Sequence, residues 1–359
     1  LVGLGTSATI DLEAWRRAVA KGASKARQRG NSRIAVPLPE IDGHDFEELA
    51  TAATEAAILT SYRYREFKAA STEEVGLEEI LIAAPVDIAS ATTRAQIVAD
   101  ATCWARDLVN TPSNMKQPDS LAARAIEMAE ETGLTFENID DKAANELGLN
   151  ALLAVGQGSA VGPRLITLEH RPEGAANQPT VLIGKGITFD TGGISLKPAQ
   201  KMGDMKADMS GAAAVFGTMR VLAELNAPTW VIGVTPLAEN MPGSQAYRPS
   251  DVIRAYDGTT IEVLNTDAEG RVVLADALAY ACKRYEPCRI VDLATLTGAC
   301  VVALGSQAAG LMGNDDDLCN ELVSAGEATG ERLWRLPAWS AYDKLVDSEV
   351  ANVRNSAGR

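Results

Sequence analysis

The amino-acid sequence predicts an α/β protein with two domains. Its 359 residues exceed the usual size of a single domain, and a hydrophobic content of 46% is enough for sizeable cores. Beyond residue 110, short apolar runs alternate with longer helical patterns, which is typical of a sheet layered with helices.

The first part of the chain has the pattern of a small α/β domain. Two helices and two short strands are predicted in it, over Asp11–Arg29, Asp45–Leu59, Arg33–Leu38 and Ile80–Ala84. A long periodic helix follows over Thr92–Asn110 and ends at the turn residues Asn110-Thr-Pro-Ser113. We therefore place an N-terminal domain at 1–91, a connecting helix at 92–110 and the main domain at 111–359.

The main domain is predicted to form around one buried sheet. Five apolar runs have the composition of buried strands: Leu152–Val155, Leu165–Glu169, Val181–Ile183, Trp230–Leu237 and Ile290–Leu293. Two clear helical patterns lie among them, over Ala212–Leu225 and Val272–Arg284. Residues 352–359 have the pattern of a loop and the first residue is Leu1, so we expect both ends to be incomplete.

Charge and cysteine content oppose several functional classes. The 33 Lys and Arg residues face 48 Asp and Glu, and the net charge of −15 disfavours broad adhesion to nucleic acid or anionic membranes. No apolar stretch approaches the roughly 18 residues of a spanning helix, and no signal peptide is recognisable. The five cysteines form no CxxC pair and fit no complete disulfide framework, which predicts a reducing, cytoplasmic location.

One basic run interrupts the acidic chain. Its members are Arg16, Arg17, Lys21, Lys25, Arg27, Arg29 and Arg33. The run leaves an additional DNA-binding role open as an alternative. We favour a solvated helix, because Asp11 and Glu13 at the start and cations at the end match the helix dipole.

The densest group of ligand-forming side chains is Asn265-Thr-Asp-Ala-Glu-Gly-Arg271. Asp267 and Glu269 are two residues apart, so in an extended segment both carboxylates project from one face. Closely packed carboxylates repel one another unless divalent cations lie between them. Capping of the helix that follows is the alternative for these two acids.

Two further loops carry residues of the same kind. Lys185 and Asp190 follow an apolar run and precede a flexible Gly-Gly pair, and Asp208 precedes a predicted helix. Taken singly, they are a solvated lysine, a turn former and a helix cap. Their coincidence with Lys197 and Arg271 favours an oxygen-rich centre for two metal ions. Only two histidines are present in the chain, so a His-rich zinc site or a Ser-His-Asp triad has almost no material.

These motifs resemble the leucine aminopeptidase (cytosol aminopeptidase) family of two-metal exopeptidases. The signature at 265–271, the stretch from Lys185 to Lys197 and Met205-Lys-Ala-Asp208 keep the family's order and spacing. The likeness spans about Asn110–Arg359. It implies a catalytic domain with a mixed sheet sandwiched between helices, preceded by a smaller, partly missing α/β N-terminal domain.

The resemblance also implies how two divalent ions are held, as Mn²⁺ or Zn²⁺, with Mg²⁺ a further choice. Lys185, Asp190, Asp208 and Glu269 hold the tighter ion, and Asp190, Asp267 and Glu269 hold the more exchangeable one. As a ligand, the lysine must be neutral, which burial and two nearby dications favour.

An activity follows from the same resemblance. A metal-bridging hydroxide attacks the first peptide bond of substrates with a free N-terminus and releases Leu-like residues. Lys197 polarises the carbonyl, and Arg271 holds a bicarbonate that relays the proton. The substrate contacts are Met205, Asn265, Ala268, Thr295, Leu296 and Gly298. Family members assemble as homohexamers.

A two-metal amidohydrolase or phosphoesterase is an alternative that uses the same carboxylates. Such sites usually recruit several histidines. Gly184-Lys185 is not part of a P-loop, because Pro179 replaces the upstream glycine. Gly3-Leu-Gly5 and Gly156-Gln-Gly158 lack the full dinucleotide-binding fingerprint.

Overall fold

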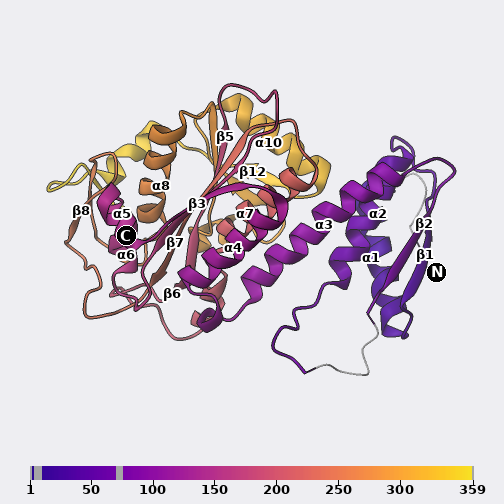
Figure 1. Ribbon diagram of the computed structural model, residues 1–359, viewed down its shortest axis with the longest axis horizontal. Coiled ribbons are helices and arrows are strands. Elements are labelled where there is room, and N and C mark those ends of the chain that lie inside the picture. Colours follow the sequence, from indigo (N-terminus) through magenta and orange to yellow (C-terminus); the bar gives the residue numbers. More distant parts are fainter. Residues whose placement is uncertain (1, 4–9, 70–75, 358–359) are drawn as a thin grey trace. The chain divides into compact units, whose positions relative to one another are not determined.

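The computed structural model describes residues 2–3, 10–69 and 76–357. The chain divides into two compact units. The first combines Leu1–Asn110 with Phe216–Pro228, and the second combines Thr111–Val215 with Thr229–Arg359. Both units contain helices and sheets (Figure 1), so the predicted α/β class is confirmed.

The first unit contains the five elements that the sequence predicts there, close to their predicted bounds. They are α1 (Leu12–Gln28), β1 (Arg33–Pro37), α2 (Phe46–Ser61), β2 (Glu79–Ala83) and α3 (Ala89–Asn110). Strands β1 and β2 pair in parallel, with α2 between them in the chain. Asp11 caps α1, and Asp45 forms a capping box with Glu48 at the start of α2.

Most of the basic run lies on α1, which is amphipathic, whereas Arg29 follows the helix and Arg33 begins β1. Trp15 and Val19 are buried in the core of this unit, whereas Arg17, Lys21 and Lys25 are exposed. The cations therefore follow the solvent side of a helix whose other side packs against apolar residues.

The second unit contains the remaining elements. Its helices are α4 (Pro118–Thr132), α5 (Asp141–Leu147), α6 (Asn150–Gly156), α7 (Ser210–Glu224, which runs into the first unit), α8 (Gly270–Tyr285), α9 (Gly298–Leu304) and α10 (Asp316–Thr329), with short 3-10 turns η2 (Ser113–Met115), η3 (Met202–Ala207) and η4 (Ser340–Val346). Its strands are β3 (Thr135–Ile139), β4 (Arg164–His170), β5 (Thr180–Gly184), β6 (Gly186–Asp190), β7 (Val231–Asn240), β8 (Val252–Arg254), β9 (Thr260–Glu262), β10 (Arg289–Leu293), β11 (Ala309–Leu311), β12 (Leu333–Arg335) and β13 (Val353–Arg354).

The central sheet of this unit is mixed, as expected. Its order is β10-β5-β7-β4-β3, and β6 continues the line of β5 along β7. Strands β10, β5, β6 and β7 are parallel, whereas β4 and β3 are antiparallel to their neighbours. Figure 1 shows α6 and α8 on one side of this sheet and α4 on the other. Strands β10 and β5 end level with the middle of β7, whereas β6 and β7 end together at the paired residues Asp190 and Asn240.

The prediction of a strand over Leu152–Val155 is wrong, because these residues form α6. The helix has no side-chain cap of its own. Instead, the buried Asp276 on α8 accepts hydrogen bonds from the backbone N–H groups of Ala151 and Leu152, at 2.8 and 2.9 Å. This carboxylate satisfies two N–H groups of the first turn from a distant part of the sequence.

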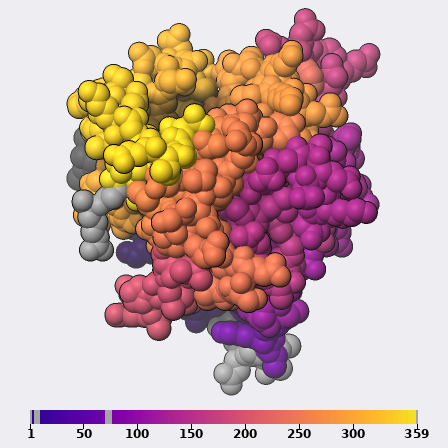
Figure 2. Space-filling view, turned by 90° about the vertical axis from the view of Figure 1, so that its left-hand side faces the viewer, coloured from indigo at the N-terminus to yellow at the C-terminus, as the bar shows by residue number. Residues whose placement is uncertain are grey.

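The expectation of a loop over residues 352–359 is also wrong in part. Val353–Arg354 forms β13, which pairs in parallel with β9. Figure 2 shows the last described residues, in yellow, lying against the orange segment that contains β9. In the part of the chain that the structure describes, no helix combines the length and apolar character needed to cross a membrane.

Candidate metal centre

Close backbone packing fixes Lys185 between the end of β5 and the start of β6. Its N–H donates to the carbonyl of Leu293 at 3.0 Å, and its carbonyl accepts from the N–H of Ala212 at 2.9 Å. A Cβ on Gly184 would lie 2.5 Å from the Gly211 carbonyl, and one on Gly211 would lie 2.0 Å from that of Leu293. These two glycines let β5, β10 and the start of α7 meet, and the lysine is buried between them.

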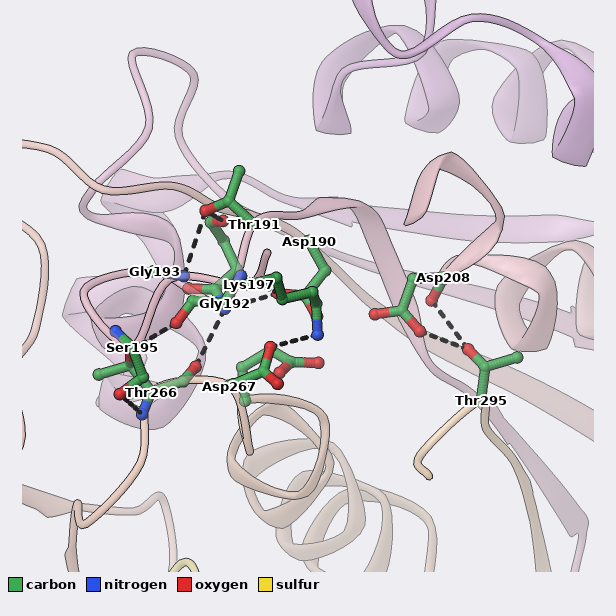
Figure 3. A network of polar contacts seen from close by, with 12 residues as sticks. Asp190, Thr191, Gly192, Gly193, Ser195, Lys197, Asp208, Thr266, Asp267 and Thr295 are labelled. Atoms are coloured by element: carbon green, nitrogen blue, oxygen red, sulfur yellow. Dashed lines mark hydrogen bonds and ion pairs between the residues drawn. The ribbon is translucent and has the colours of Figure 1, made fainter. Parts of the chain in front are cut away.

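Lys185, Asp208 and Glu269 form what we call the inner cluster. The Nζ atom of Lys185 lies 2.8 Å from Asp208 Oδ2 and 2.7 Å from Glu269 Oε1. The three side chains are only 3, 7 and 1% exposed. Thr295 completes the cluster: its carbonyl accepts from Nζ at 3.2 Å, and its hydroxyl donates to Asp208 Oδ1 at 2.6 Å (Figure 3).

Burial dominates the electrostatics of the inner cluster. It raises the pKa of Glu269 to about 7, with the carboxylates of Asp190 and Asp208 adding to the effect. It also raises the pKa of Asp208. Burial alone would lower the pKa of Lys185, but Glu269 and Asp208 outweigh it and raise that pKa. The neutral lysine expected from the sequence therefore depends on nearby dications, because the carboxylates favour the ammonium.

Lys197, Asp190 and Asp267 form an outer cluster beside the inner one. Lys197 Nζ lies 2.7 Å from Asp190 Oδ2 and also contacts Asp267 Oδ1 (Figure 3). Asp190 is buried, but Lys197 and Asp267 are 21 and 33% exposed. Burial acts to lower the pKa of Lys197, and the two carboxylates outweigh it and raise the pKa. Both clusters thus place one ammonium between two carboxylates.

The two clusters meet at three carboxylates that are suited to a divalent cation. Asp190, Asp267 and Glu269 each offer an oxygen, and these oxygens all lie within 4.8 Å of one another. Glu269 Oε2 is buried, and no described residue forms a hydrogen bond with it. Carboxylate oxygens are the ligands that hard divalent cations prefer, and a cation would satisfy this unpaired atom.

The signature loop brings its carboxylates together through a turn. Asp267 lies in the turn, where its N–H donates to Asn265 Oδ1 at 2.9 Å, and Glu269 has helical backbone angles at the start of α8. The extended segment assumed from the sequence is therefore wrong. The side chain of Glu269 makes no capping hydrogen bond either, and that of Asp208 is held by Lys185 and Thr295.

The expected substrate-binding residues lie on three segments near the clusters: η3, the signature loop and the loop after β10. Met205 is half-buried on η3, just before Asp208. Asn265 and Ala268 lie in the signature loop and are joined by a 3.2 Å backbone hydrogen bond. The side chain of Asn265 already serves the turn at Asp267.

The loop after β10 supplies the other expected contacts. The Thr295 hydroxyl is directed at Asp208, Leu296 is 45% exposed, and Gly298 begins α9 on the surface. Arg271 is exposed at the start of α8, and its guanidinium makes no ion pair with the residues that the structure describes.

Sequence reasoning missed the side chains that hold these loops. Asn355 is buried, and its amide accepts from Leu264 N–H at 2.8 Å and donates to the Asn265 carbonyl at 2.7 Å. Asn240 and Thr266 are also fully buried and join the loop of Asp190 to that of Asp267. No local pattern marks a buried amide as a loop support, because its partners lie far away in the sequence.

Comparison with known proteins places this geometry in one family. The family model described as the cytosol aminopeptidase family, catalytic domain, matches residues 103–359, and the model of that family's N-terminal domain matches residues 1–71. The chain belongs to the cytosol aminopeptidase family. It is accordingly a hydrolase of the metallo-exopeptidase class, as the sequence motifs predicted.

Relatives in this family match the whole chain. A probable cytosol aminopeptidase of Syntrophotalea carbinolica is 46% identical over an alignment of 367 positions, which covers 100% of this chain and 74% of the relative. One of Roseiflexus castenholzii is 47% identical and is covered to 75%. Among solved structures, the bottromycin maturation enzyme BotP in complex with Mn is similar with a TM-score of 0.91 and 40% identity, over 100% of this chain and 77% of that one.

Proposed function

We propose that this enzyme releases N-terminal amino acids, with a preference for Leu-like residues, from peptides whose N-terminus is free. The observation that carries the proposal is the group formed by Asp190, Asp267 and Glu269, whose oxygens lie within 4.8 Å of one another. Such a group suits divalent cations, and membership of the cytosol aminopeptidase family links it to peptide hydrolysis.

The residues of the two clusters fit a pair of divalent ions. Lys185, Asp190, Asp208 and Glu269 would hold the tighter ion, and Asp190, Glu269 and Asp267 the exchangeable one. When bound, the ions supply Lewis acidity that activates water and polarises a peptide carbonyl. Mn²⁺ is our first choice, because the solved structure of BotP contains Mn. Zn²⁺ and Mg²⁺ also suit oxygen donors.

We assign Lys197 and Arg271 to roles that the metal ligands do not fill. Lys197 is partly exposed beside Asp267, so its ammonium can turn toward a substrate carbonyl and stabilise negative charge on that oxygen. Arg271 has an exposed guanidinium, whose planar fork suits a bicarbonate that accepts the proton. No other base stands out within the signature loop.

The proposed specificity rests on a free amine and an apolar contact. Asp208 would receive the substrate ammonium or amine near the exchangeable ion. Met205 is half-buried on η3, and Leu296 is 45% exposed, so both can contact an apolar side chain. Asn265, Ala268 and Gly298 would contact the substrate backbone.

Hydrolysis of Leu-amide and N-acetyl-Leu-amide tests this proposal. With added Mn²⁺, we expect release of leucine from the first substrate only, and no release after chelation. Equal cleavage of both substrates would instead indicate an amidohydrolase without N-terminal selection. Phosphate ester hydrolysis without peptidase activity would indicate a phosphoesterase.

Location and assembly complete the proposal. All five cysteines are free, which supports a reducing compartment such as the cytosol.

Val302, Trp339 and Trp334 are 89, 67 and 64% exposed, and such exposed apolar side chains support the assembly of several copies of the chain into a homohexamer. Light scattering of the purified protein measures the number of chains directly.

A further inference from the structure

Asn240, the last residue of β7, joins the two loops that carry the outer carboxylates. It is fully buried and pairs in register with Asp190 at the end of β6. One N–H of its Nδ2 donates to Asp190 Oδ1 at 2.7 Å, and the other donates to the Thr266 carbonyl at 3.0 Å. Thr266 directly precedes Asp267 in the chain. A single amide therefore spans both carboxylate-bearing segments.

The hydrogen bond to Asp190 determines which of its oxygens faces the clusters. Oδ1 accepts from Asn240 and also from the N–H of Gly192, at 2.9 Å. These two donors occupy that oxygen and fix the plane of the carboxylate. The other oxygen, Oδ2, faces Lys197 in the outer cluster at 2.7 Å.

The second hydrogen bond fixes the backbone beside Asp267. The Thr266 carbonyl also accepts from the Tyr247 hydroxyl at 2.8 Å. The Thr266 hydroxyl donates to the Gly192 carbonyl at 2.6 Å and accepts from the N–H of Ser195 at 2.8 Å (Figure 3). The signature loop is thus tied to the loop of Asp190 at several points, and the Asn240 side chain forms hydrogen bonds with both loops.

The amide orientation of Asn240 is dictated by its surroundings. Both partners of Nδ2 are acceptors, so a flipped amide would set oxygen against oxygen. The remaining atom, Oδ1, is buried and has no hydrogen-bond partner among the residues that the structure describes. A buried acceptor left unpaired destabilises the folded state. The Asn240 amide therefore fixes the positions of the carboxylates even though its unpaired oxygen lowers the stability of the folded state.

We infer that Asn240 is a positioning residue that sets the separation of Asp190 and Asp267 before a cation binds. The inference rests on the proposed two-metal function. Lys197 offsets the repulsion between the two carboxylates in the metal-free protein, and the amide adds a fixed tie between the loops that carry them. A cation that displaces the ammonium then meets ligands already in place, so little reorganisation is subtracted from the free energy of binding.

Titration calorimetry with Mn²⁺ on wild type, Asn240→Leu and Asn240→Asp tests the inference. Both variants lose the two N–H donors, and only the second adds charge. We expect the weaker of the two binding steps to lose ~10–100-fold in affinity in both, as is usual for residues that support metal ligands. We also expect the magnetic coupling between paired Mn²⁺ ions to disappear from the electron paramagnetic resonance spectrum.

Thr235→Val is the matched control, because Thr235 is a fully buried polar residue of the same strand whose hydroxyl bonds the Ile166 carbonyl. It should keep both affinities. Mn²⁺ affinity in Asn240→Leu equal to that of wild type overturns the inference. A loss of Mn²⁺ affinity that is fully explained by a lower melting temperature of the metal-free variant also overturns it. Failure of the wild type to bind Mn²⁺ overturns the proposed function instead.

Discussion

The inner and outer clusters have the same chemistry and opposite accessibility. Each places one lysine ammonium between two carboxylates. Lys185 is 3% exposed in the inner cluster, whereas Lys197 is 21% exposed in the outer one, beside an Asp267 that is 33% exposed. Under the proposed function, this difference in burial would separate a lysine that holds an ion from one that contacts the substrate.

We expect the largest effect on activity from a substitution that removes the carboxylate of Glu269, which lies where the two clusters meet. Glu269→Gln should lower kcat/KM for Leu-amide by a factor on the order of 10³. Because burial raises the pKa of Glu269, the neutral side chain should leave the metal-free protein at least as stable. Steady-state kinetics and thermal melting measure both. Activity within tenfold of wild type would show that the clusters do not share this residue.

The next prediction separates the two lysines by matched substitutions. Lys197→Met should lower kcat by about 10²–10³ and keep the bound metal, because an oxyanion-stabilising donor is lost. Lys185→Met should instead lose the tightly bound ion. Metal analysis after dialysis, alongside kinetics, distinguishes them. Equal metal loss in both variants would remove the proposed division of roles.

A smaller effect is expected at the Thr295 hydroxyl, which orients Asp208 in the inner cluster. Thr295→Val should lower the affinity for the more tightly bound Mn²⁺ ion by ~10-fold or more, as is usual for groups that orient metal ligands. Thr295→Ser keeps the hydroxyl and is the control. A change confined to KM, with metal affinity intact, would assign Thr295 to substrate contact alone.

The last prediction concerns the stability of the segment that leads to Asp208. Lys116 is buried, and its Nζ donates to the carbonyl of Lys206 on η3 at 2.7 Å. Burial lowers the pKa of Lys116 to about 7, with the positive charges of Lys206 and Arg124 adding to the effect. The folded state therefore binds fewer protons than the unfolded state between pH 7 and about 10.4, the ordinary lysine pKa.

The free energy of unfolding contributed by Lys116 should accordingly rise with pH above 7. Between pH 7 and 9, wild type should gain about 2 kcal/mol relative to Lys116→Met. Urea unfolding of both proteins at the two pH values measures the difference. Parallel curves would mean that this lysine keeps its ordinary pKa.

Much of the fold could be predicted from the sequence, because most elements carry their own signals. Asp11 and Asp45 mark helix starts, and the runs at Leu165–Glu169 and Val181–Ile183 are strands. The failure at Leu152–Val155 has a clear cause: a short apolar run fits strand and helix equally. Asp276, more than a hundred residues later, decides it.

The candidate site shows the same division between local signals and distant contacts. Charged residues in rare combinations, such as Asp267 with Glu269, stand out in the sequence. The amides of Asn240 and Asn355 do not, because only the fold brings them to the loops they hold. The turn that actually joins the carboxylates likewise depends on contacts that no local pattern contains.

Anomalous diffraction from crystals grown with Mn²⁺ tests whether the two clusters together hold a pair of ions. We expect two ions in each chain, one contacting Lys185, Asp208 and Glu269, and the other contacting Asp267 and Glu269, with Asp190 contacting both. Ions bound elsewhere on the protein, with these side chains left paired to one another, would contradict this expectation.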